Sequence, residues 1–163
     1  MLADDPATAE VHLRREYERL AQMGERRLLG TTAAKLARVI AAQGPERYDE
    51  AIHLIAISQE VGVDEDVSAQ AVGQGVTARI LAGRGQHREA EELARSAVAL
   101  AAQSDLLTER ADTLLDLAHV LAAAGRLSEA HDAGIQALDL YRRKGNLPGS
   151  RESRRYLTRY PHV

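Results

Sequence analysis

The sequence repeats a short pattern with a period of about forty residues, and this repetition limits the fold more than any other feature. The segments 85–90 (GQHREA) and 125–130 (GRLSEA) are forty residues apart, and Ala97 and Ala137 stand seven residues beyond their final alanines. In the segment 48–51 (YDEA), Ala51 lies thirty-nine residues before Ala90. A period of this length predicts supersecondary units that stack on one another.

Each unit is predicted to be a pair of helices. Before the turn glycine Gly125, apolar residues recur on one face of a helix at Leu114, Leu117, Ala118 and Leu121. After it, a second and narrower apolar face is formed by Ala130, Gly134, Ala137 and Tyr141. The small residues on this face allow two helix backbones to approach closely, so the unit is a helical hairpin.

Capping residues and helix-breaking residues extend this pattern over the chain. Helices are expected near 25–43, 47–61, 67–83, 87–103, 108–124 and 128–144. Glycines mark their ends at Gly44, Gly62, Gly85, Gly125 and Gly145. Asp66 and Ser128 are candidate N-caps, and Pro148 suits the first turn of a last helix. We therefore expect one domain, 1–163, with a half-repeat helix (7–23), three hairpins (25–61, 66–103 and 107–144) and a capping helix (148–159).

The repeats resemble those of the tetratricopeptide repeat family, whose pattern places a Leu and a small residue in the first helix, then Gly, then two alanines in the second. This pattern is filled by Leu117, Ala118, Gly125, Ala130 and Ala137. The resemblance implies an all-α fold, an α-solenoid of about three antiparallel helical hairpins with flanking helices. It also implies a module that binds a protein or peptide. The repeats are nearer forty residues than the family's usual thirty-four.

A narrower resemblance covers residues 67–146. This region is similar to the C-terminal repeat region of large bacterial signalling proteins that also carry a nucleotidyl cyclase or ATPase domain. The segments 77–82 (TARILA) and 141–146 (YRRKGN) carry the similarity. It implies a regulatory or scaffolding role in a bacterial signalling or transcription-control system.

No catalytic or metal-binding motif stands out in the sequence. The chain has no cysteine, which excludes a thiolate zinc site, and its six histidines form neither HExxH nor an i, i+4 pair. The segment 73–78 (GQGVTA) has the letters of a dinucleotide fingerprint, but no strand is predicted before it. Gly73 and Gly75 instead suggest a helix that is weak, kinked or closely approached by a ligand. We expect no enzyme activity, no cofactor and no metal.

The predicted location is the cytoplasm. Residues 1–15 are charged and lack the apolar stretch of a secretion signal. No segment approaches the 18 or so apolar residues of a membrane span. The absence of cysteine also gives no indication of an oxidising compartment.

One set of residues suggests a binding surface. Arg38, Arg79 and His119 each stand six residues before a turn glycine, so they occupy equivalent positions in the three hairpins. The family resemblance implies that this position faces the concave groove, with Lys35, Asp112 and Asp116 nearby. Such a ladder of donors could hold an acidic peptide, because Arg binds carboxylates through a planar fork. The alternative is that Arg38 and Arg79 pair with carboxylates of a neighbouring helix.

Two other functions stay open at this stage. The C-terminal segment could attract nucleic acid through its basic residues, with Tyr156 and Tyr160 either stacking on bases or forming the apolar face of a capping helix. The net charge of −3 makes nucleic acid the less favoured partner. A homodimer is also possible, because an array of repeats exposes an apolar edge where it ends.

Overall fold

The computed structural model describes residues 6–61 and 67–161, and every regular element in these two ranges is helical. The all-α prediction is therefore confirmed for the described residues. The elements, in chain order, are α1 (Pro6–Met23), α2 (Arg26–Ala41), the short 3-10 helix η1 (Pro45–Arg47), α3 (Tyr48–Val61), α4 (Val67–Gly83), α5 (His87–Ala101), α6 (Leu107–Ala123), α7 (Leu127–Lys144) and α8 (Leu147–Arg159).

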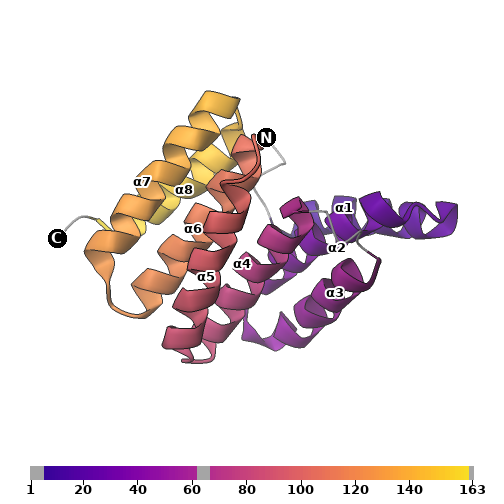
Figure 1. Cartoon of the computed structure of the whole chain (residues 1–163), viewed down its shortest axis with the longest axis horizontal. Helices are drawn as coiled ribbons and strands as arrows, with labels where there is room; N and C mark the ends of the chain where they lie inside the picture. Colours follow the sequence, from indigo (N-terminus) through magenta and orange to yellow (C-terminus); the bar gives the residue numbers. More distant parts are fainter. Residues whose placement is uncertain (1–5, 62–66, 162–163) are drawn as a thin grey trace.

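Consecutive helices pair, and the pairs lie side by side (Figure 1). The most extensive contacts join α2 to α3, α4 to α5 and α6 to α7. Helix α4 also packs against α2 on one side and α6 on the other, so the first helices of the three pairs form one layer. Helix α1 packs on α2 and α8 packs on α7 at the two ends of the array.

The predicted helix ranges agree with the observed ones to within two residues at each end. The turn glycines explain this agreement, because Gly44, Gly85, Gly125 and Gly145 all have positive φ angles that other residues rarely adopt. Pro148 lies in the first turn of α8, as expected. The expected helix end at Gly62 and the expected N-cap at Asp66 lie outside the described residues.

The N-cap prediction for Ser128 is wrong. Helix α7 begins one residue earlier, at Leu127, so Arg126 occupies the N-cap position and its side chain makes no capping hydrogen bond. The Arg126 side chain instead donates from Nε to Glu129 Oε1 at 2.7 Å. Asn146 caps α8, accepting a 3.0 Å hydrogen bond from the backbone N–H of Gly149.

The buried side chains form two clusters that meet at α4. Val72, Val76 and Ile80 of α4 join a cluster with side chains of α2 and α3. Ala78 and Ala82 of the same helix join a second cluster with side chains of α5, α6, α7 and α8. Helix α4 therefore connects the two halves of the core, and its geometry sets how the first and third helix pairs approach each other.

None of the helices in the described part of the chain is both long enough and apolar enough to cross a membrane.

Candidate functional site

Five of the six residues predicted to line the groove come together in the structure. Arg38 extends from α2 and Arg79 from α4, while Asp112, Asp116 and His119 lie on α6. The sixth, Lys35, is exposed on α2, and no ion pair connects it to this group within the described residues. The sequence therefore identified the residues of one cluster, although their mutual contacts differ from a free ladder of donors.

Arg38 forms a buried ion pair with Asp116. Its Nη2 donates to Asp116 Oδ2 at 2.6 Å, and the two side chains are 17% and 0% exposed. Arg38 Nη1 lies 3.5 Å from the backbone oxygen of Asp112 and 3.9 Å from its carboxylate. The phenol of Tyr141 donates a hydrogen bond to that same Asp112 carboxylate. For Arg38 the structure thus has an internal ion pair, as in the alternative given above, although the carboxylates lie on α6, with α4 between that helix and α2.

The pair spans α4, and a glycine allows it to do so. A Cβ atom on Gly75 would lie 2.3 Å from Asp116 Oδ2, which is closer than any real contact. Because Gly75 has no side chain, the Asp116 carboxylate passes over the α4 backbone and reaches Arg38 on α2. The segment 73–78 lies inside α4, so its glycines belong to a helix interior. Close approach was one of the alternatives suggested by the two glycines, and at Gly75 it is made by the protein's own carboxylate, whereas Gly73 meets only Ile55 Cγ2 at 3.6 Å.

Burial and charge shift the pKa values of the pair in ways that support an internal role. Burial alone would lower the pKa of Arg38, but the Asp116 and Asp112 carboxylates outweigh it and raise the pKa. Burial raises the pKa of Asp116 to about 6, against the attraction of Arg38 and Arg79. Both groups are therefore charged at pH 7, although Arg38 Nε and Asp116 Oδ1 lack hydrogen-bond partners.

Arg79 is held much less tightly than Arg38. Its Nη1 lies 3.6 Å from Asp116 Oδ1, which is an ion-pair distance but not a hydrogen bond, and its side chain is 21% exposed. Arg79 also lines a hollow of about 240 Å³ at the ends of α2, α4 and α6. The hollow is bordered by Ala41, Ala42, Gly44, Tyr48, Arg79, Ala82, Gly83, His119 and Ala123.

His119 borders the same hollow in its neutral form. Burial lowers its pKa well below the ordinary 6.5, and the positive charges of Arg79, Arg38 and Arg159 lower it further. The imidazole packs edge-on against the Tyr156 ring of α8, with 4.7 Å between ring centroids and an interplanar angle of 73°. At pH 7 His119 therefore contributes one N–H donor and one ring acceptor, without a charge.

Tyr48 is the residue of the hollow that sequence reasoning missed. It begins α3, directly after the turn formed by Gly44 and η1. A Cβ atom on Gly83 would lie 2.3 Å from its phenol oxygen, so the glycine at the end of α4 gives that phenol its space. The signal in the sequence was Gly83, the first glycine of the segment 83–85 (GRG), which the turn itself does not require.

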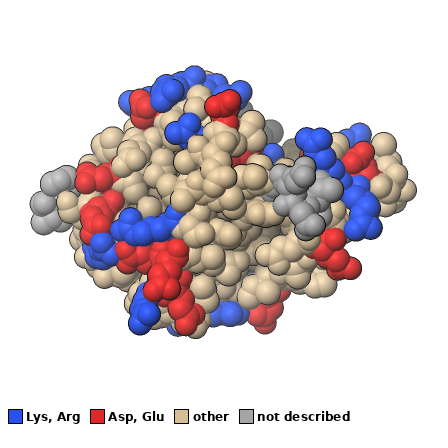
Figure 2. Space-filling view, in the orientation of Figure 1, with Lys and Arg blue, Asp and Glu red and all other residues tan. Residues whose placement is uncertain are grey.

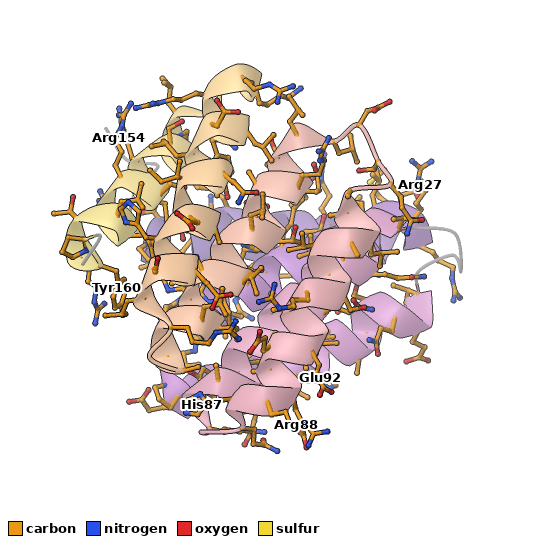
Figure 3. The ribbon with its side chains drawn as sticks, turned by 60° about the vertical axis from the view of Figure 1, so that its left-hand side comes forward. Arg27, His87, Arg88, Glu92, Arg154 and Tyr160 are labelled. Atoms are coloured by element: carbon orange, nitrogen blue, oxygen red, sulfur yellow. The ribbon has the colours of Figure 1, made fainter. Side chains whose placement is uncertain are left out.

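A larger hollow of about 670 Å³ lies at the turn between α4 and α5, but one short segment forms it. Its lining residues all fall between Gly85 and Glu92. Figure 3 shows His87, Arg88 and Glu92 there, at the outer end of α5. Because no second element closes over these side chains, this hollow brings together no set of groups from different helices.

Charged side chains on the outside of the molecule fall into two kinds of surface. Over the starts of α5 and α7, acidic and basic side chains lie next to one another (Figure 2). Here the Glu91 carboxylate forms an ion pair with Arg95 at 2.9 Å and a second ion pair with Arg126. Around the end of α7 and along α8 the exposed side chains are mostly basic: Arg142, Arg143, Lys144, Arg151, Arg154, Arg155 and Arg159.

The two C-terminal tyrosines are part of the packing of α8. Tyr156 is 4% exposed, and its phenol donates to the backbone oxygen of Ala118 at 2.7 Å. The Tyr160 ring lies 5.0 Å from that of Tyr156, and the Arg159 guanidinium lies 5.6 Å from the Tyr160 ring. These contacts fit the capping-helix interpretation and leave the Tyr156 ring unavailable for stacking on bases.

The described residues include no group of three or more His, Asp or Glu side chains that could hold a metal ion. No model of a known protein family matches this sequence, and no curated protein matches it either. The interpretation of the site therefore depends on its own geometry and on the repeats.

Proposed function

We propose that this protein is a tetratricopeptide-like α-solenoid that binds a segment of another protein and performs no chemistry of its own. Two observations support the proposal: the forty-residue repeat in the sequence and the stacking of helix pairs in chain order. The similarity of residues 67–146 to the repeat region of bacterial signalling proteins supports a regulatory or scaffolding role for this protein. In this proposal it acts in the cytoplasm of a bacterium, within a signalling or transcription-control system.

The binding face in this proposal is the layer formed by α2, α4 and α6. The observation that carries it is the hollow at the ends of these helices, where Tyr48, Arg79 and His119 converge from three different helices. Concave sites with a few convergent polar groups are where proteins bind ligands most often. By the tetratricopeptide resemblance, the layer of first helices is the concave side, so a partner lying along it would cross this hollow.

The size of the hollow favours a macromolecular partner. At about 240 Å³ it is smaller than the roughly 300–1,000 Å³ of typical small-molecule sites. It can accept one side chain, while the rest of a partner segment lies on the exposed residues beside it. Lys35, Ala42 and Ala123 are exposed on the same three-helix layer or at the rim of the hollow.

Affinity capture with matched variants tests the proposal. The baits are the wild-type chain, the face variant Lys35→Glu/Ala123→Leu, and the control Arg88→Glu/Ser96→Glu, whose changes lie at exposed positions of α5. Arg38 is left unchanged because its loss would disturb the core. We expect a protein that the wild type and control retain and the face variant loses. Retention of the same protein by all three baits would contradict the proposed face.

Nucleic-acid binding is the second candidate function, and the basic surface at the end of α7 and along α8 is the observation that favours it. With Tyr156 buried, such binding would depend on phosphate contacts and fall steeply with added salt. Nuclease treatment of the lysate before capture separates the two functions. Self-association is a third candidate, which sedimentation at several concentrations tests.

A further inference from the structure

A network of four charged side chains joins α1 to α3, the outer helix of the first pair. Arg47, directly before α3, donates to Glu10 of α1 at 2.7 Å and also pairs with Glu50. Arg14 of α1 pairs with the same two carboxylates, Glu10 at 2.6 Å and Glu50 at 2.7 Å. A network of several charges holds two helices together better than an isolated surface pair does.

The same network recurs between α5 and α7. Arg126, directly before α7, pairs with Glu91 of α5 and donates to Glu129 at 2.7 Å. Arg95 of α5 pairs with Glu91 at 2.9 Å and with Glu129 at 3.4 Å. Each side chain has the same type and the same partners as its counterpart in the first network, so the arrangement belongs to the repeat.

The junction between α3 and α5 lacks this network on its α3 side. Ala51 of α3 aligns with Ala9 and Ala90, the alanines directly before the two glutamates. The residue after Ala51 is Ile52, which is 38% exposed, and the arginine position holds Ala56, which is also exposed. Helix α3 therefore presents apolar side chains where α1 and α5 carry the charged ones.

On the α5 side of this junction, a glutamine replaces the arginine. Gln86 stands directly before α5, as Arg47 and Arg126 stand before α3 and α7. Its amide donates within its own helix pair, to Glu89 of α5 at 3.2 Å. Over the described ranges 6–61 and 67–161, no ion pair joins α3 to α5.

The buried side chains divide at the same junction. Buried residues of α2 and α3 share a cluster with residues of α4, and this cluster contains none of α5. The α5 residues Ala90 and Ala94 belong to the other cluster, with α6 and α7. Helix α3 also contacts α4 less extensively than α5 contacts α6. Apolar packing therefore couples the second and third helix pairs more closely than the first and second.

The side chains that do bridge this junction lie away from its outer side. Arg38 and Asp116 join α2 to α6 in the layer of first helices, at 2.6 Å. Where α4 ends and α3 begins, Arg84 pairs with Asp49 at 3.1 Å, and Asp49 is 96% exposed. An exposed pair of this kind contributes little. The outer side of the junction, toward the ends of α3 and α5, is thus the least restrained.

We propose that the outer side of the α3–α5 junction is a hinge, at which the helices α1–α3 and α4–α8 move as two bodies. In a stacked array each unit contacts only its neighbours, so motion concentrates where neighbours are held least. Because the Arg38–Asp116 pair holds the layer of first helices, the opening is confined to the outer side. This motion does not depend on what the array binds.

Distances between spin labels test the hinge in the full chain. The sequence has no cysteine, so two introduced cysteines are the only labelling sites. Glu60 of α3, Ala99 of α5 and Asp139 of α7 are exposed at equivalent repeat positions. The labels at 60 and 99 should give a distance distribution about twice as wide as those at 99 and 139. Equal widths would overturn the hinge.

An exchange of residues between the two junctions tests its cause. Ile52→Glu/Ala56→Arg/Gln86→Arg completes the network at the α3–α5 junction, where Glu89 is already present, and should narrow the distribution between labels at 60 and 99. The reverse exchange, Glu91→Ile/Arg95→Ala/Arg126→Gln, should widen the distribution between labels at 99 and 139. Circular dichroism checks that each variant is folded.

The matched control adds charge elsewhere. Ile135→Glu/Gln136→Arg changes two exposed residues of α7, and should leave the distribution between labels at 60 and 99 unchanged. Widening by the reverse exchange alone still supports the inference, because it shows that the network restrains a junction of this kind. If neither exchange alters the widths, or if the control narrows the α3–α5 distribution as much as the completed network does, the inference is wrong.

Discussion

Arg38 on α2 and Asp116 on α6 form an ion pair across an intervening helix, with 2.6 Å between Arg38 Nη2 and Asp116 Oδ2. The pair joins the first and third helix pairs directly, although α4 lies between them. Gly75 makes the contact possible by leaving the α4 backbone uncovered. We infer that this pair braces the α2, α4 and α6 layer, which keeps a face built from three separate helices preorganised.

Removing the Arg38 side of the pair should destabilise the fold strongly. In Arg38→Met, Asp116 stays fully buried and retains only the 3.6 Å contact with Arg79. Breaking a buried pair from one side costs about 3–5 kcal/mol, because a buried charge is left without compensation. Urea unfolding at pH 7 measures the loss. The double variant Arg38→Met/Asp116→Asn should recover most of it, and a single variant as stable as the wild type would contradict the brace.

The same variant should be less destabilised in acid. Burial already raises the pKa of Asp116 to about 6, above its ordinary 3.8, and loss of Arg38 should raise it further. When a carboxyl group has a higher pKa in the folded state than in the unfolded state, its protonation stabilises the fold. This stabilisation is complete below the pKa of the unfolded state and is lost as the pH rises through the pKa of the folded state. The loss in free energy of unfolding caused by Arg38→Met should therefore become smaller when the same urea experiment is repeated at pH 5 instead of pH 7. A deficit that is constant with pH would exclude Asp116 as its source.

Two glycines of α4 should respond to alanine in opposite directions. Gly75→Ala places a Cβ 2.3 Å from Asp116 Oδ2, so it should destabilise the protein even though Ala favours helices. Gly73→Ala meets only Ile55 Cγ2 at 3.6 Å, an ordinary contact, and should stabilise by up to about 1 kcal/mol. Thermal unfolding of both variants checks this. The same sign in both would show that helix propensity, and not the Asp116 contact, governs these positions.

The docking of α8 should depend on one buried hydrogen bond. Tyr156→Phe removes the phenol that donates to Ala118 O at 2.7 Å, and should cost about 1 kcal/mol. Tyr160→Phe is the matched control, because that side chain is only partly buried and should change stability much less. Chemical denaturation gives both values. Equal effects would mean that ring packing alone attaches α8.

The attachment of α1 should weaken in acid. Hydrogen bonds from Arg47 and Arg14 lower the pKa of Glu10 to about 2, from the ordinary 4.5. Because this folded pKa lies below the unfolded one, the carboxylate stabilises the fold above pH 4.5 and loses this effect as pH falls through 2. Glu10→Gln should therefore cost about 1 kcal/mol at pH 7, a value that allows for solvent screening, and almost nothing near pH 2.

Denaturation of Glu10→Gln across this pH range provides the measurement. Glu18→Gln, an exposed change on the same helix, is the control and should follow the wild type throughout. A Glu10→Gln deficit that persists unchanged near pH 2 would rule out the ionised carboxylate as its origin.

Much of the fold could be predicted because its signals are local. Turn glycines at a forty-residue spacing mark helix ends through their positive φ angles, a property of single residues. The same spacing identified Arg38, Arg79 and His119 as equivalent, and the family pattern placed Asp112 and Asp116 near them. For the candidate site, the sequence therefore supplied most of the residues.

Which of these residues contact one another could not be predicted from the sequence. Whether Arg38 faces a ligand or Asp116 depends on how closely α2 and α6 approach over Gly75, a relation between residues more than forty positions apart. Tyr48 was missed for the same reason, because its place in the hollow follows from the space that Gly83 leaves at the end of another helix. Which hydrogen-bond donors stay available to a ligand therefore depends on how closely helices distant in the sequence approach each other, and not on the local conformational preferences of single residues.

Photo-crosslinking of a partner from the layer of α2, α4 and α6 would show most directly whether this layer binds a protein. A benzoylphenylalanine replaces either Ala123, at the rim of the hollow, or Ser96, an exposed residue of α5, and each chain is irradiated in lysate of the source cell. One protein should be crosslinked from Ala123 and not from Ser96, and Lys35→Glu should abolish the product. Crosslinking from Ser96 alone, or no product from Ala123, would contradict a protein-binding face on α2, α4 and α6.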